Sequence, residues 1–202
     1  MPVVEFLQFT LSGVSFGMIY AAVALSLVLI WRGTRLLNYA QGGMAMITTY
    51  VAIEVIYRTG SYWAGFVVAL VAGILLGAVC QLTIIRPTMN KPPLNAVIVT
   101  IGLLVLLEGL AGIFFGGQYR SFPAAFSVTG LKISGTALGV SAFDVFVVVA
   151  VLVTTLVLAA AFRYTSAGLR MRAAAFNATI ARLSGIRVAR VLTVGWALAG
   201  LL

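Results

Sequence analysis

Long apolar stretches constrain this chain more than any other feature of its sequence. They occupy residues 6–31, 36–53, 59–85, 92–119 and 145–162, and another begins at 191 and is still apolar at residue 202. Apolar segments of roughly 20 residues have the length of a membrane-spanning helix. Only 8% of the residues are charged, against about 25% in soluble domains. The sequence therefore predicts an all-α, polytopic transmembrane helical bundle with five spans and the start of a sixth, truncated at its C-terminus.

The composition excludes several kinds of chemistry. The chain has no histidine, which rules out a Ser-His-Asp triad, a Cys-His pair and a His-based metal site. Its four acidic residues leave little for carboxylate catalysis, and the single cysteine, Cys80, lies in an apolar stretch. We therefore expect no enzyme, and neither metal nor cofactor in this chain. The net charge of +9 does not imply a nucleic-acid partner. Basic residues that flank membrane spans determine how a protein is oriented in the lipid bilayer, and we therefore expect no nucleic acid to bind.

The basic residues also predict which side of the membrane each loop faces. Placing residues 163–190 in the cytoplasm puts ten basic residues inside and three outside, which agrees with the positive-inside rule. The inside set is Arg32, Arg35, Arg86, Lys91, Arg163, Arg170, Arg172, Arg182, Arg187 and Arg190, and the outside set is Arg58, Arg120 and Lys132. The N-terminus then lies outside. This prediction requires residues 36–53 to cross the membrane fully rather than re-enter it.

The arginine-rich stretch near the end carries an apolar stripe at helical period. The stripe is Leu169, Ala173, Phe176, Ile180 and Leu183. It predicts a cytoplasmic amphipathic helix over about 166–185, with Ser166 as N-cap and Gly185 in the left-handed position after the last turn. Two interpretations are open. The helix lies on anionic lipid, or it docks into a groove on a cytoplasmic partner, which its flat, alanine-rich face favours.

Three stretches of the chain, taken together, resemble LivH-type permeases, the membrane subunits of branched-chain amino-acid ABC importers. The first contains Arg172, Asn177, Ala181, Gly185 and Ile186. The second is Leu-Asn-Tyr-Ala-Gln-Gly-Gly at 37–43, and the third is Arg-Pro at 86–87, followed by Val-Thr-Ile-Gly-Leu at 99–103 and Phe-Gly-Gly at 115–117. The resemblance covers the whole chain. One departure is Gln41, which stands where the family usually has a histidine and cannot take up a proton near neutral pH.

The resemblance implies a single transmembrane permease domain over residues 1–202, in a bacterial or archaeal cytoplasmic (inner) membrane. The chain would form half of the path for branched-chain or related amino acids. Its implied partners are two cytoplasmic ABC ATPase subunits that bind ATP and Mg, a second permease subunit and an extracytoplasmic solute-binding protein. If import is driven by ATP, the absence of a Walker A pattern in this sequence requires the ATPase to be a separate subunit. The alternatives are a permease for urea or short amides, or an ATPase-independent channel or facilitator.

Two sets of residues are candidates for these roles. The ATPase-coupling set is Arg172, Phe176, Asn177, Ile180, Ala181, Gly185 and Ile186. The substrate-path set is Asn38, Gln41, Gly42, Gly43, Thr48, Thr100 and Glu108. Helices interrupted by glycine beside polar side chains recur at substrate sites; alternatively, Asn38 caps a helix at the cytoplasmic interface. Glu108, an acid within a span, is expected to face protein or water, or to bond a neighbouring backbone near the outer helix end.

The predicted orientation in the membrane can be tested by chemical labelling. A cysteine placed at Ala175 should react with a membrane-impermeant thiol reagent only after the cytoplasmic side is opened, because residue 175 lies in the basic cytoplasmic segment. Labelling of intact cells or spheroplasts, compared with permeabilised ones, measures this accessibility. Reaction from the outside alone would contradict the predicted orientation and, with it, docking of this segment to a cytoplasmic ATPase.

Overall fold

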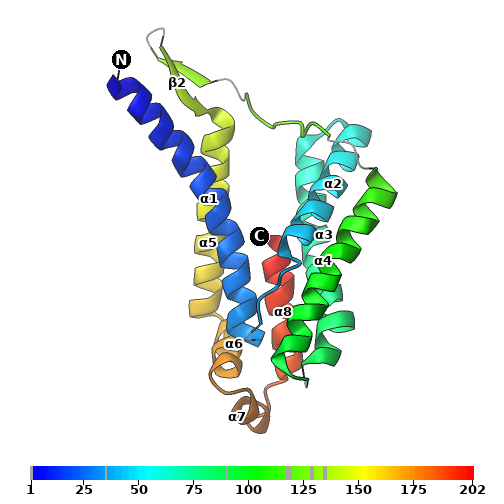
Figure 1. Cartoon of the computed structure of the whole chain (residues 1–202). Helices are drawn as coiled ribbons and strands as arrows, with labels where there is room; N and C mark the ends of the chain where they lie inside the picture. The colour runs from blue at the N-terminus through cyan, green and yellow to red at the C-terminus, as the bar shows by residue number, and fades with distance from the viewer. Residues whose placement is uncertain (1, 35, 90, 117–119, 128–129, 134–135) are drawn as a thin grey trace.

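The computed structural model describes residues 2–202, apart from 35, 90, 117–119, 128–129 and 134–135. Six long or medium helices form a bundle, and two short helices lie across one end of it (Figure 1). The bundle helices are α1 (Pro2–Thr34), α2 (Gln41–Thr59), α3 (Tyr62–Cys80), α4 (Pro93–Phe115), α5 (Ala142–Tyr164) and α8 (Val188–Leu201). The short helices are α6 (Ser166–Phe176) and α7 (Ala178–Leu183). After α3 the chain continues through a π-helical turn, η1 (Gln81–Ile85), and a 3₁₀ turn, η2 (Arg86–Thr88).

Four helices in the described part of the chain are long and apolar enough to cross a membrane. They are Phe9–Arg32 within α1, Tyr62–Thr88 through α3 and its two following turns, Leu94–Phe115 in α4 and Ala142–Tyr164 in α5. The apolar α8 is shorter. This confirms the predicted all-α polytopic bundle. The stretch predicted to span at 36–53 differs, because residues 36–40 are not helical and α2 continues past Ile53 to Thr59.

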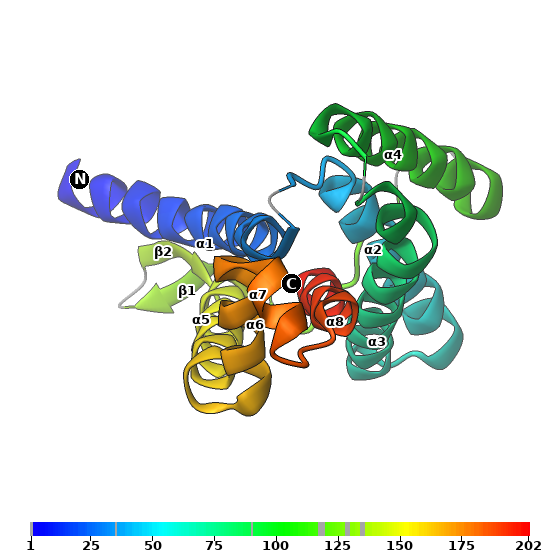
Figure 2. The same cartoon turned by 90° about the horizontal axis from the view of Figure 1, so that it is seen from below.

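Helix α8 lies at the centre of the bundle. Figure 2 shows α1 and α5 on one side of it and α2, α3 and α4 on the other. The buried core joins both sides through α8, because Trp196 and Ala199 share one apolar cluster with Ile30 of α1, Leu158 of α5 and Met44 of α2. Trp196 is the largest fully buried side chain in the described residues. The two groups of helices are therefore held together mainly by a short helix that neither group contains.

The contact between α3 and α8 depends on glycine. A Cβ atom added at Gly77 would lie 2.2 Å from the carbonyl oxygen of Trp196, and one added at Gly73 would lie 2.0 Å from that of Gly200. Such close backbone approach is the usual role of small residues between membrane helices. By contrast, no atom of the described residues lies within 4 Å of a Cβ built on Gly13 or Gly17 of α1. Of these two glycine pairs, Gly73 and Gly77 are therefore the pair that packs against another described helix.

The predicted division of charge matches the two ends of the bundle. At the lower end of Figure 1 lie the last turns of α1 and α5, the turns after α3, helices α6 and α7, and the start of α8. These segments contain the basic residues predicted to face the cytoplasm, except Lys91, which follows η2, Arg187, which directly precedes α8, and Arg35, which lies outside the described residues. Arg58 is in the last turn of α2 at the opposite end. Which end faces the cytoplasm stays a prediction.

The segment between α4 and α5, for which the sequence favoured no structure, contains a small antiparallel strand pair. Strand β1 (Gly130–Ile133) pairs with β2 (Thr136–Ser141), with Ile133 opposite Thr136. Ser141 then caps α5 in a capping box: its hydroxyl accepts a hydrogen bond from the Asp144 N–H, and the Asp144 carboxylate accepts one from the Ser141 N–H. The cap sets where α5 begins, at the end of the bundle away from α6 and α7.

The glycine contact yields a stability prediction. Gly77→Ala should destabilise the protein by about 1–3 kcal/mol, because the new methyl group overlaps the backbone of α8 and the helices must move apart. Gly13→Ala, the matched control, should not destabilise the protein, since its Cβ meets open space among the described residues and alanine favours a helix over glycine. Thermal unfolding of the two purified variants in one detergent measures the difference. Equal melting temperatures would contradict the packing described.

Candidate substrate path and coupling surface

Helix α2 begins inside the bundle rather than at its end. The chain leaves α1, runs without helical structure over Leu36–Ala40 and enters α2 at Gln41 (Figure 1). Asn38, in this connection, is 1% exposed, and its Oδ1 accepts a hydrogen bond from the Ala40 N–H at 3.1 Å. The residue preceding α2 is Ala40, and no side chain caps the helix. The interpretation that Asn38 caps a helix at the interface is therefore wrong, since it folds the connection instead.

A pair of side-chain amides joins this helix start to α8. Asn38 Nδ2 donates to Gln41 Oε1 at 3.1 Å, and Gln41 Nε2 donates to the Ala199 carbonyl oxygen at 3.0 Å. In a membrane interior, non-helical backbone and amide side chains persist only where protein or trapped water satisfies them. The amide pair provides some of these hydrogen bonds, to the Ala40 N–H and to the Ala199 carbonyl oxygen. It also ties the start of α2 to the last turn of α8.

The other predicted path residues divide into two groups. Gly43 packs on α4, where its Cβ would lie 3.0 Å from a Leu104 methyl group, and Thr100 is buried on the same helix. Gly43 therefore lies at the contact between α2 and α4, whereas Gln41 bonds α8, and the Thr100 hydroxyl donates to the Val97 carbonyl oxygen of its own helix. Gly42 and Glu108 are exposed, and Thr48 donates its hydroxyl hydrogen to the Ala45 carbonyl oxygen of its own helix. The structure does not bring these last three into the cluster.

A second polar contact, which the sequence did not single out, joins α8 to the end of α3. The Thr193 hydroxyl donates to Gln81 Oε1 at 2.6 Å, and Gln81 is fully buried. Within the described residues, Gln81 Nε2 and Trp196 Nε1 are buried donors without a hydrogen-bond partner. An unpaired buried donor costs about 1–3 kcal/mol, so both mark places for a water or a polar ligand. A lone amide within the apolar stretch 59–85 was the available signal.

The predicted amphipathic helix over 166–185 is two helices. Asn177 is extended (φ −152°, ψ 104°), ends α6 and caps α7, because its Oδ1 accepts from the N–H groups of Thr179 and Ile180 at 3.0 Å. A side chain that bonds the next two amides competes with a continuous helix. The N-cap of α6 is also one residue earlier than predicted, at Thr165 rather than Ser166, with the hydroxyl accepting from Gly168 N–H.

The end of α7 follows the sequence prediction. Gly185 is left-handed (φ +80°), its N–H donates to the Arg182 carbonyl oxygen, and the Ile186 N–H donates to that of Ala181. These two bonds form a Schellman motif. They turn the chain sharply before α8, which begins at Val188 and runs upward through the bundle from its lower end in Figure 1.

The α6–α7 segment has one attached face and one open face. Ala174 and Ala181 are buried in a small apolar cluster with Val188 and Leu192 of α8. The predicted stripe points the other way: Phe176 is 90% exposed, Leu183 is 85% exposed, and Leu169 and Ile180 are exposed as well. Arg172 secures α6 further, because its Nη1 donates to the Phe162 carbonyl oxygen at the end of α5 at 2.7 Å. The four exposed apolar side chains are called the coupling surface below.

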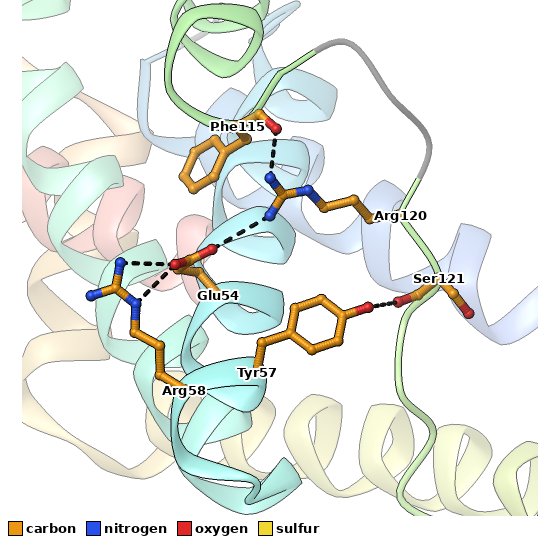
Figure 3. A network of polar contacts seen from close by, with 6 residues as sticks. All are labelled: Glu54, Tyr57, Arg58, Phe115, Arg120 and Ser121. Carbon is orange, nitrogen blue, oxygen red and sulfur yellow. Dashed lines mark hydrogen bonds and ion pairs between the residues drawn. The ribbon is translucent and has the colours of Figure 1, made fainter.

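A network of charged and polar side chains lies at the opposite end of the bundle, where it joins α2 to the end of α4 (Figure 3). Glu54 of α2 pairs with Arg58 at 2.8 Å and with Arg120 at 3.4 Å, and Arg120 Nη2 donates to the Phe115 carbonyl oxygen at the end of α4. The Tyr57 hydroxyl donates to the Ser121 carbonyl oxygen. The network attaches the segment after α4 to α2. Sequence reasoning ended the span at Ile53 and so missed Glu54, although Glu54 and Arg58 have the spacing of a helical ion pair.

This architecture defines a multi-pass helical membrane protein whose second helix starts at a polar cluster inside the bundle. The chain belongs to the family described as branched-chain amino acid transport system / permease component, whose model matches residues 9–202. The resemblance to LivH-type permeases is thereby confirmed. Membership of a transport-permease family and the four apolar helices make the chain a multi-pass inner-membrane protein.

Several curated relatives support this assignment. The chain is 28% identical over 203 residues to the high-affinity branched-chain amino acid transport system permease protein LivH of Escherichia coli K12, covering 94% of this chain and 65% of the relative. The protein of the same name from Salmonella typhimurium is 27% identical, with the same coverage. A probable branched-chain amino acid transport permease protein LivH of Methanocaldococcus jannaschii is 27% identical, over 89% of this chain and 58% of the relative. No solved structure matches. The chain thus spans about 65% of the length of the two bacterial relatives.

The amide pair leads to a prediction for transport. Gln41→Leu should lower solute uptake without loss of membrane assembly, because it removes the hydrogen bond that joins the start of α2 to α8, at a cost of about 1 kcal/mol. Thr48→Val should leave uptake unchanged, since the Thr48 hydroxyl bonds only its own helix among the described residues. Uptake by cells producing equal amounts of each variant is the measurement. Parental uptake by Gln41→Leu would remove Gln41 from the path.

Proposed function

We propose that this chain is the permease component of an ATP-driven importer and forms half of the transmembrane path for branched-chain or related amino acids. Its family and the printed names of its relatives support this proposal. The polar groups at the broken start of α2 and beside α8 are neutral amides and a hydroxyl, in otherwise apolar surroundings. Such a lining suits a small neutral or zwitterionic solute. The same amides would also suit urea or a short amide, which is the alternative substrate class.

The coupling surface is the observation that supports the proposal that import is driven by ATP. Phe176 and Leu183 expose nearly their whole side chains beyond the end of the bundle, on the face of α6–α7 away from α8. Large apolar side chains in water favour a protein groove that covers them. In this proposal the groove belongs to two cytoplasmic ATPase subunits, which bind ATP and Mg. A second permease completes the path, and an extracytoplasmic solute-binding protein delivers the solute.

A continuous series of contacts leads from the coupling surface to the polar cluster. Ala181 of α7 packs with Val188 and Leu192 in the first turns of α8, and Ala199 in its last turn accepts the bond from Gln41. Packed elements of this kind transmit displacement when they have two discrete arrangements. In the proposed mechanism, ATPase movement displaces α7 and α8 together, and α8 shifts the start of α2 between open and closed positions. The access of solute to the path then follows the state of the ATPase.

A charge placed in the coupling surface tests the proposal. Phe176→Asp should weaken ATPase association at least about tenfold, because the docked state loses the burial of a phenyl ring. Ile180→Asp should act in the same direction, and neither should prevent membrane insertion. Co-purification of the ATPase with the permease measures association, and ATP-dependent uptake of leucine into proteoliposomes that contain all subunits measures function.

Phe176→Leu is the matched control, because it keeps an apolar side chain at the same position and should retain both association and uptake. Full co-purification of the ATPase with Phe176→Asp would contradict docking at this surface. In the same proteoliposomes, solute entry without ATP would favour a channel or facilitator. Faster ATP-dependent uptake of urea than of leucine would move the substrate to the alternative class.

A further inference from the structure

A cavity of about 490 Å³ lies between α1, α5, α6 and α8, toward the arginine-rich end of the bundle. Figure 2 shows these elements gathered on one side of α8. Its inner wall is apolar and includes Leu25 and Leu29 of α1, Leu158 of α5 and Leu192 of α8. Leu25 is seven residues before Arg32 on α1, so the apolar part extends about 10 Å inward from the level of that arginine. The proposed substrate-path residues do not line this cavity.

Three arginines line the same cavity: Arg32 at the end of α1, Arg163 at the end of α5 and Arg172 in α6. No acidic residue is among its lining residues. The ion pairs of the described residues both involve Glu54, at the other end of the bundle. The bond from Arg172 to Phe162 uses Nη1, and a guanidinium has five N–H donors in all. The lining of this cavity thus contains three positively charged side chains and no negatively charged one.

A second, independent feature is part of the cavity wall. Trp196 lines the cavity, is 1% exposed, and its Nε1 has no hydrogen-bond partner within the described residues. Buried indole N–H groups usually find an acceptor. The cavity therefore offers cations at one end, an apolar wall inward of them and one unpaired donor within that wall. A ligand that matches these three features carries an anionic head, an ester carbonyl and a hydrocarbon chain.

We propose that the cavity binds one acidic glycerophospholipid. Its phosphate lies against Arg32, Arg163 and Arg172, an ester carbonyl accepts from Trp196 Nε1, and an acyl chain fills the space between α1, α5 and α8. Basic pockets between membrane helices are known receptors for acidic lipid head groups. The site differs from general adsorption of α6–α7 to the membrane surface, because Arg182, Arg187 and Arg190 do not line it. A lipid bound here bridges α6 to α1 and α5.

The test uses the full chain, purified with its partner subunits in a mild detergent. Native mass spectrometry measures the binding of phosphatidylglycerol and of phosphatidylcholine with the same acyl chains. Phosphatidylglycerol should bind more tightly than phosphatidylcholine. The double variant Arg32→Gln, Arg163→Gln should bind phosphatidylglycerol about 25-fold more weakly, about fivefold for each arginine removed near an anionic head group.

The matched control is Arg182→Gln, Arg187→Gln, which changes the net charge equally at exposed positions outside the cavity and should retain parental binding. Equal binding of the two lipids by the parental protein, or equal loss in both double variants, would overturn the proposal. Displacement of phosphatidylglycerol by millimolar inorganic phosphate would also overturn it, because the site would then recognise a free anion rather than a lipid.

A measurement on the unaltered protein makes the test independent of variant folding. Phosphatidylglycerol with a photoreactive acyl chain should cross-link to the cavity segments 158–163 and 191–196. The same photoreactive chain on phosphatidylcholine should label those segments at least about fivefold less, relative to the labelling of α4, which does not line the cavity. Identical cross-linking patterns for the two lipids would reject the site.

Discussion

The structure depends on one constraint: inside a bilayer every backbone N–H and C=O group must be paired within the protein. Helices meet this constraint along most of the chain. Residues 36–40, within the bundle, are not helical, and there the side chains of Asn38 and Gln41 supply hydrogen bonds that a helix would otherwise provide. The polar cluster proposed as part of the solute path is thus also what permits α2 to begin inside the bundle. Its structural role and its proposed role in transport rest on the same two amides.

Helix α8 connects the parts of the molecule that have different roles. Its first turns pack on α6 and α7, its middle places Trp196 in the core, and its last turn receives the Gln41 amide. Glycine contacts with α3 leave no layer of side chains between the two backbones, so the helices pack directly on each other. The polar cluster and the arginine-lined cavity both adjoin this one short helix, and the opposite face of α6–α7 from the coupling surface packs on it. In the proposed mechanism, a displacement that enters at α7 reaches the polar cluster through these contacts.

Sequence reasoning was most reliable where a property depends on neighbouring residues. The apolar stripe over α6 and α7 and the left-handed Gly185 could be predicted, because both follow from spacing along one segment. Within the site, Asn38 and Gln41 were identified by their polarity in an apolar stretch. The break at Asn177 was missed because asparagine is compatible with both a helix and a cap. Glu108 was selected as the acid within a span, yet the acid that forms ion pairs is Glu54.

The sequence by itself determined that the chain is a bundle of membrane helices, that basic residues gather at one end, and that an apolar stripe lies beside them. These properties follow from local composition and helical period, which a linear pattern records fully. Only the tertiary structure decided which polar groups pair, such as Gln41 with Ala199, 158 residues away, and Thr193 with Gln81. It also decided that α8 is central and that Arg32, Arg163 and Arg172 share a cavity. The physical reason is that such contacts depend on the relative depth and rotation of separate helices, to which no local pattern refers.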